Sequence, residues 1–263
     1  VPYQALANLE EAIDNQDIPS ILAAMPTLGR VTQSGIAIEI PDENVRMSLD
    51  SSIFEMLDHV GRIPTGLRLG IDGLRLDIGA LLPDDREPFD ELGLDTVVLT
   101  SDTLLKWDRP SENINLDFIA SVEQMGTLSG EASVGDVPAV VFDQPDVKTL
   151  SALEGTTINE IALRFDDDGL IERAIALSAR EEGIEYGAME TRLKGMIPVF
   201  LSELNDPILA NQLADSLNAV IETGASISLK AVARTPLPLA TLGLSMQRPA
   251  TVASLFEIEV SNP

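Results

Sequence analysis

Alternation of apolar and polar residues dominates the first half of the chain. The segments "GIAIEI" (35–40) and "VRMSLD" (45–50) alternate on either side of the turn-forming "PDEN". A period of two is typical of a strand with one buried face, so the two segments predict a hairpin. Three further strands are predicted within 95–137, separated by "RPS" and "QMG". Their short connections require antiparallel neighbours.

The segment 67–78 alternates in two halves that are out of phase. Leu67, Leu69 and Ile71 continue as Leu74, Leu76 and Ile78 after a slip at Gly73. One extra residue reverses the face on which apolar side chains lie, so the slip predicts a β-bulge. Residues 51–61 before it fit either a short helix or an irregular strand, and 83–93 fit a short helix.

A helical period follows a strand predicted at 156–165 and continues to Gly224. The first helix is expected within 169–183 and a second from Tyr186 to Phe200, with a kink at Pro198. A third helix is expected to begin at Asp206-Pro207 and to end at Gly224, because these residue types are favoured at those positions.

The remaining segments complete an α+β fold. Strands are expected at 226–233, 237–246 and 250–260, and two short helices at 3–25. We therefore predict a curved, mostly antiparallel sheet or sheets with a C-terminal helical segment packed on one face. The chain is expected to be one β-rich domain, 1–263, with two halves, 1–137 and 155–263, as the alternative.

The charge of the chain limits its partners. There are 43 Asp and Glu against 17 Lys and Arg, which gives a formal net charge of −26. Nucleic acids and anionic lipid surfaces attract basic proteins, so neither is an expected partner. No run reaches the roughly 18 apolar residues of a spanning helix, so the chain as given is not expected to be transmembrane.

Chemistry-bearing motifs are few. Cysteine is absent and His59 is the single histidine, which leaves no common zinc site. Neither a nucleophile elbow nor a nucleotide-binding glycine motif occurs, so we expect no metal, no cofactor and no identifiable catalytic residue. The remaining possibility for an enzyme is a catalytic site made of acidic residues alone. The sequence does not identify such a site, because any two of its 43 carboxylates could be chosen as the catalytic pair.

The stretch "RFDDDG" (164–169) has two interpretations, a calcium loop or a turn. With Gly169 at the sixth position of an EF-hand loop, the first and twelfth positions would be Arg164 and Ile175. Neither can bind calcium, so we favour a turn between a strand ending at Phe165 and a helix starting at Leu170, with Asp168 able to cap the helix.

Two longer stretches resemble a known group of proteins. Residues 61–108 and 161–184, followed by paired helices and "SISLKAVARTPLPLATL" (226–242), are similar in pattern to the YdgA-like and AsmA-like groups of Gram-negative envelope proteins. The resemblance implies many amphipathic antiparallel strands, a periplasmic location and a role near lipid. The resemblance also implies a signal or anchor segment, which we do not expect within the given residues. The resemblance carries over no site residue.

Three functional hypotheses follow. The first is a periplasmic envelope protein that binds a lipid or fatty acyl ligand in an apolar groove between the sheet and the helices. The second is a structural module that docks an envelope protein partner, and the third is an acid-only enzyme. The residues expected to line the groove come from one strand and one helix: Leu69, Ile71, Met189, Leu193, Met196 and Phe200.

Overall fold

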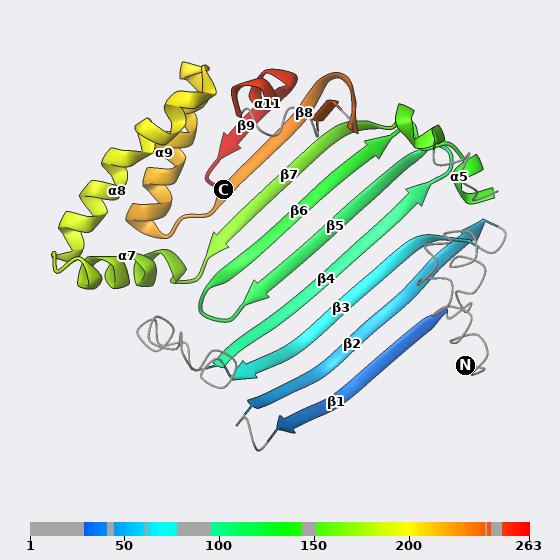
Figure 1. The fold of residues 1–263 in the computed structure, drawn as a ribbon, viewed down its shortest axis with the longest axis horizontal. Coiled ribbons are helices and arrows are strands. Elements are labelled where there is room, and N and C mark those ends of the chain that lie inside the picture. The colour runs from blue at the N-terminus through cyan, green and yellow to red at the C-terminus, as the bar shows by residue number, and fades with distance from the viewer. Residues whose placement is uncertain are drawn as a thin grey trace.

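A computed structural model describes residues 29–40, 45–60, 63–77, 96–143, 151–239, 241–242 and 249–263. The fold is α+β, with an open, curved, antiparallel sheet of nine strands whose spatial order is their order in the chain (Figure 1). The strands are β1 Arg30–Ile40, β2 Val45–Val60, β3 Ile63–Asp77, β4 Thr96–Asp108, β5 Asn113–Val122, β6 Gly126–Gly135, β7 Thr157–Asp167, β8 Ile227–Pro238 and β9 Phe256–Ser261.

The predicted hairpin and meander are confirmed as β1–β2 and β4–β5–β6. Residues 51–60, for which a short helix was one alternative, belong to the long strand β2. The bulge is also confirmed, because the β3–β4 register shifts between Ile71 and Leu74 and Gly73 has a φ of 61°. The segments 3–25 and 83–93 lie outside the described residues.

Helices occur mainly in the connection between β7 and β8. They are α7 Leu170–Glu181, α8 Tyr186–Leu201 and α9 Pro207–Thr223, with a short 3-10 turn, η2, at Ser202–Leu204. The predicted ends of α9 are confirmed. The Asp206 carboxylate accepts hydrogen bonds from the backbone N–H groups of Ile208 and Leu209 at 3.0 and 3.1 Å, and Gly224 ends the helix in the left-handed region.

The three helices pack chiefly on one another and lie beyond the β9 side of the sheet (Figure 1). Ile175, Ala179 and Met189 form their buried cluster, against which Leu193 and Ile221 also pack. Sheet and helices meet where α9 lies beside β9 and β8. Leu193, which was expected to line a groove between the sheet and the helices, therefore faces the other helices instead.

The C-terminal region differs from its prediction. Residues 250–255 were expected in a strand but belong to the helix α11 Pro249–Leu255, and only Phe256–Ser261 form a strand. Pro249 suits a first helical turn, and Val252 and Leu255 are three residues apart on one side of the helix. Both side chains pack on the buried cluster of Ile158, Ala231, Leu237 and Phe256, so α11 closes the core over β7–β9.

The described part of the connection between β6 and β7 contains a short helix, α5 Val140–Asp143, and a 3-10 turn, η1 Ser151–Gly155. It covers the end of the sheet at Trp107, which is 3% exposed. The Trp107 indole Nε1 donates to the Val137 carbonyl at 3.1 Å, and its ring lies 4.3 Å from that of Phe142. This ring therefore packs over the end of the core.

Candidate ligand-binding face

The two faces of the sheet differ sharply in chemistry. Side chains directly opposite one another on paired strands point to the same face, so the register assigns every strand residue to a face. One row of opposed residues crosses six strands from β7 to β2: Leu163, Gly130, Phe118, Thr103, Leu69 and Phe54. The neighbouring row contains Ile161, Ala132, Leu116, Leu105, Leu67 and Met56. We call this side the apolar face.

The middle of the apolar face is accessible. Leu69, Leu105, Leu128 and Leu163 are exposed by 43, 38, 42 and 40%, and they come from four different strands. Gly130 is buried between Phe118 and Leu163. A Cβ at this position would lie 2.5 Å from the Phe118 side chain and 2.8 Å from that of Leu163. A residue without a side chain lets its two large neighbours approach each other, which makes the apolar surface continuous.

Described elements cover this face only at two places. The helix α11 packs over β7–β9 through Val252 and Leu255, and the α5 segment covers the far end of β4 at Trp107. Figure 1 shows α11 and the α7–α9 group at the β9 side and α5 at the strand ends, with β3–β6 between them. The exposed leucines lie on or beside these uncovered strands.

The opposite side, the polar face, carries ion pairs. Arg68 forms a two-pronged contact with Asp102 at 2.7 and 3.0 Å, and Lys230 lies 2.8 Å from Glu160. A shallow, open depression of about 500 Å³ crosses β4–β8 on this side. Its lining comes mainly from polar-face residues, among them Asp102, Asp117, Ser129, Glu131, Arg164 and Ser228. The alternation of the strands therefore places these charged side chains on the polar face, where Leu104 and Ile119 also lie.

The aspartates of "RFDDDG" act as structural groups. The Asp167 carboxylate accepts hydrogen bonds from the backbone N–H groups of Gly169 and Ile171 at 3.2 and 3.1 Å, and the Asp168 N–H donates to the Met125 carbonyl. The turn is confirmed, with two corrections. Strand β7 extends to Asp167, and Asp167 rather than Asp168 binds the start of α7, because the left-handed Gly169 directs the chain back over it.

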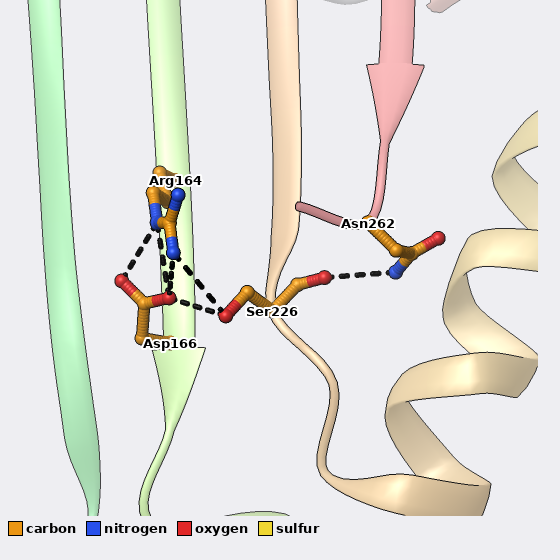
Figure 2. Close-up of polar contacts among 4 residues, drawn as sticks. All are labelled: Arg164, Asp166, Ser226 and Asn262. Atoms are coloured by element: carbon orange, nitrogen blue, oxygen red, sulfur yellow. Dashed lines mark hydrogen bonds and ion pairs between the residues drawn. The ribbon is translucent and has the colours of Figure 1, made fainter.

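Asp166 belongs to a polar network that joins four segments, with residues from three of them drawn in Figure 2. Arg164 Nη2 and Nε lie 2.6 and 2.8 Å from its two carboxylate oxygens, and Ser226 Oγ also contacts it. Asn262 then donates to the Ser226 carbonyl at 2.8 Å and to the Ser216 carbonyl in α9 at 3.3 Å. We call Arg164, Asp166, Ser226 and Asn262 the clasp, since it ties β7, the start of β8, the C-terminal end and α9 together.

The clasp does not have the properties of a catalytic site. Hydrogen bonds from Arg164, and then from Ser226, lower the pKa of the Asp166 carboxyl, and burial opposes them only in part. A carboxylate stabilised in its charged form by a guanidinium is a weak base, so it cannot activate the Ser226 hydroxyl. Among the described residues, no group of three or more Asp, Glu or His side chains is placed to hold a metal ion. His59 is exposed on β2.

The structure divides the six predicted groove residues into separate groups. Leu69 and Ile71 lie on the apolar face of β3. Met189 and Leu193 pack inside the helical cluster, where Met189 is 3% exposed. Met196 and Phe200 lie on the outer side of α8, exposed by 38 and 69%. Five strands, β4–β8, separate β3 from β9, beside which the helices lie, so the structure does not bring the six together.

Other members of the apolar face were missed by sequence reasoning. Phe118, Leu128 and Leu163 lie on β5, β6 and β7, and each was inside a correctly predicted strand. Their signal was the same alternation that selected Leu69 and Ile71. What the sequence lacked was the register, which shows that these strands continue one surface instead of turning it toward the helices.

Comparison with other proteins gives a family and no activity. A family model described as "Uncharacterized protein" matches residues 120–263, which are 144 of the 263 residues. A comparison with curated proteins found no match. Within the described residues, no helix is long and apolar enough to span a membrane. The matched region contains β6–β9, the helices and the clasp, and because it is more than half of the chain, the protein belongs to this uncharacterised family.

Proposed function

We propose that this protein is a non-enzymatic envelope protein that binds a lipid or another acyl ligand on the apolar face of its sheet. The observation that carries the proposal is the accessible surface formed by Leu69, Leu105, Leu128 and Leu163, which are each about two-fifths exposed. Extended apolar surface on a folded protein marks a binding site more often than a free surface. The proposed ligand surface therefore lies on β3–β7 and not in the groove between the sheet and the helices that was expected from the sequence.

An acyl chain suits the chemistry of this surface. In the row from Leu163 to Phe54, the only polar side chain is Thr103, so the face offers few hydrogen-bonding groups to a polar ligand. A hydrocarbon chain needs none, and each buried methylene contributes about 0.8 kcal/mol. Micromolar binding corresponds to about 8 kcal/mol, so about ten buried methylenes provide it before the entropic cost of association.

The charge of the protein narrows the class of ligand further. A net charge of −26 repels anionic lipid surfaces. A neutral or zwitterionic lipid, taken up as a single molecule, meets no such repulsion. The resemblance to Gram-negative envelope proteins supports a periplasmic location, where a carrier or holder of lipid would work.

The competing function is an envelope interaction module that binds a protein and no small ligand. The same apolar face would then be covered by a partner's surface. The two functions differ in what a small acyl probe does, because a monomeric fatty acid saturates an acyl site but has low affinity for a flat protein-docking surface. That difference determines the test.

The test measures displacement of a fluorescent fatty acid from the purified protein, together with native mass spectrometry for retained ligand. We expect saturable, micromolar binding that falls at least tenfold in Leu163→Glu and in Leu128→Glu. Both substitutions place a charge in the middle of the apolar face, where an acyl chain would have to desolvate it.

A matched control is available on the opposite side of the same sheet. Ile119 is 47% exposed and lies beside Asp102 and Ser129 on the polar face. Ile119→Glu should fold normally, by circular dichroism, and bind the probe like the parent. No saturable binding by the parent, or an equal loss in all three variants, would reject the acyl site and leave the interaction module.

A further inference from the structure

The strand β1 is one edge of the sheet. It pairs with β2 from Arg30 to Ile40, and among the described residues no strand pairs with its other side. Figure 1 shows it as the outermost strand, opposite the helices. An edge of eleven residues presents a row of unpaired backbone donors and acceptors, which is a template for another strand.

The two edges of the sheet carry different charges. The charged residues of the β9 edge are Glu257 and Glu259, so pairing with a second β9 would bring like charges together. Its end is also occupied, because Asn262 is bonded to α9 through the Ser216 carbonyl. The β1 edge contains one base and one acid, Arg30 and Glu39, near its opposite ends. An antiparallel second β1 therefore brings unlike charges together.

The faces of β1 limit how two copies can pair. Val31 lies opposite Phe54, and Ile36 and Ile38 lie opposite Leu49 and Met47, which places all three on the apolar side. Val31 and Ile38 are seven positions apart, so an irregularity must separate them. It is Gly35, which has a φ of 65°. Two antiparallel copies keep their apolar side chains on one face only in certain registers. A residue before Gly35 in one copy must lie opposite a residue after Gly35 in the other, and their two residue numbers must add up to an odd number.

One register satisfies both the faces and the charges. We propose that two copies of this chain pair antiparallel through β1, with Arg30 of each copy opposite Glu39 of the other and a two-fold axis at Ser34–Gly35. Val31 then lies opposite Ile38 of the second copy, apolar against apolar. Shifting the register by two residues in either direction preserves the faces but loses the Arg30–Glu39 match.

The charges of neighbouring strands fit the same register. In one copy Arg68, Glu55 and Arg30 are opposed in succession across β3, β2 and β1. In the second copy Glu39 lies opposite Arg46, with their side chains 3.3 Å apart. Joined through β1, these become one row of alternating sign, Arg68–Glu55–Arg30–Glu39–Arg46. In a chain of net charge −26, such local neutrality is what self-association requires.

This pairing does not depend on ligand binding, since it uses the edge of the sheet and not its face. Its consequence is a single sheet whose apolar face runs through both copies. Disruption of the dimer and loss of acyl binding are therefore separable results.

The test uses charge reversal and native mass spectrometry or sedimentation of the purified chain. We expect a dimer of the parent, and dissociation constants raised about tenfold or more in Arg30→Glu and in Glu39→Arg, because each homodimer then contains two like-charge pairs. An equimolar mixture of the two variants should form mixed dimers of near-parental affinity, since both cross-copy pairs are again of opposite sign.

Cross-linking supplies a second readout that does not depend on affinity. The chain contains no cysteine, so a single introduced one reports on its own position. Ser34→Cys lies next to the two-fold axis and should form a disulfide-linked dimer under mild oxidation, whereas Ser261→Cys on the β9 edge should not. A monomeric parent, a dimer unaffected by both charge reversals, or a dimer lost only in Leu163→Glu would overturn the β1 pairing.

Discussion

The two ends of the sheet place the same sequence pattern in different surroundings. In β7–β9, alternating apolar residues such as Ala231 and Phe256 are 8 and 3% exposed beneath α11. In β3 and β6, Leu69 and Leu128 occupy the same face and are exposed by 43 and 42%. Alternation thus identifies which face of a strand is apolar. Whether that face is covered depends on how other segments of the chain pack. The covered end is a core, whereas the open end has the composition of a core and the accessibility of a surface.

The largest expected effect contrasts burial at the two ends. Phe256→Ala removes a buried ring beneath α11 and should lower the free energy of unfolding by about 3–5 kcal/mol. Leu128→Ala truncates a half-exposed side chain and should cost less than about 1.5 kcal/mol, since only part of the leucine is removed from water. Chemical denaturation of the two variants measures the difference. Similar losses would mean that the open end is covered in solution.

A smaller effect tests what holds the open end together in the absence of a covering layer. Gly73 and Gly35 both have φ values in the left-handed region, 61° and 65°. A Cβ on Gly73 would lie 2.2 Å from the Asp50 carboxylate, whereas one on Gly35 would meet nothing within 4 Å. Gly73→Ala should therefore cost about 2–3 kcal/mol, the backbone strain plus displacement of Asp50, and Gly35→Ala about 1 kcal/mol.

The same pair also reports on Arg75, which donates to Asp50 at 2.7 Å. If displacement of Asp50 is the additional cost at Gly73, Asp50→Ala should reduce the difference between the two glycine variants. Equal losses at both glycines, measured by urea denaturation, would show that backbone strain alone controls the bulge and that the side-chain contact contributes little.

Most of the architecture could be predicted from short-range patterns. Strands β1 and β3 to β7, the first part of β2, and helices α7 to α9 follow from alternation, helical period and the end signals Asp206, Pro207 and Gly224. The errors lie where short-range preference is ambiguous. Residues 249–255 are rich in Val, Ala and Leu, which fit strand or helix, and packing of Val252 and Leu255 on the core decides for a helix.

The candidate site was only half predictable. The assignment of Leu69 and Ile71 to the apolar face depends on alternation, which is a local property. The assignment of Met189 and Leu193 to the same groove required the helices to lie over β3, which is a property of long-range packing. The helices instead pack on each other beyond β9. The apolar sides of α7 and α8 meet at Ile175 and Met189, so the helices bury their apolar side chains against each other.

The smallest expected effect concerns the clasp, which fastens the covered end to the helices. The guanidinium of Arg164 holds the pKa of the Asp166 carboxyl below its usual value. Because the folded pKa is the lower one, the stabilisation is present at pH values above the ordinary pKa of aspartate and is lost as pH falls through the folded pKa. Asp166→Asn keeps the shape of the side chain but removes its charge, so it should slightly lower the thermal midpoint near pH 7.

That difference from the parent should shrink steadily as the pH falls below the ordinary aspartate range, where the parent carboxylate also takes up a proton. Asp168→Asn is the control, because the Asp168 carboxylate is close in the sequence but is not part of the clasp, so this variant should melt close to the parent. Thermal melts of the three proteins across acidic pH check the sign. A deficit in Asp166→Asn that grows on acidification would contradict the ion pair, and a deficit independent of pH would assign the stabilisation to the hydrogen bond with Ser226 rather than to charge. Either result would change how the covered end is held, while leaving the open end to be explained by its strand register alone.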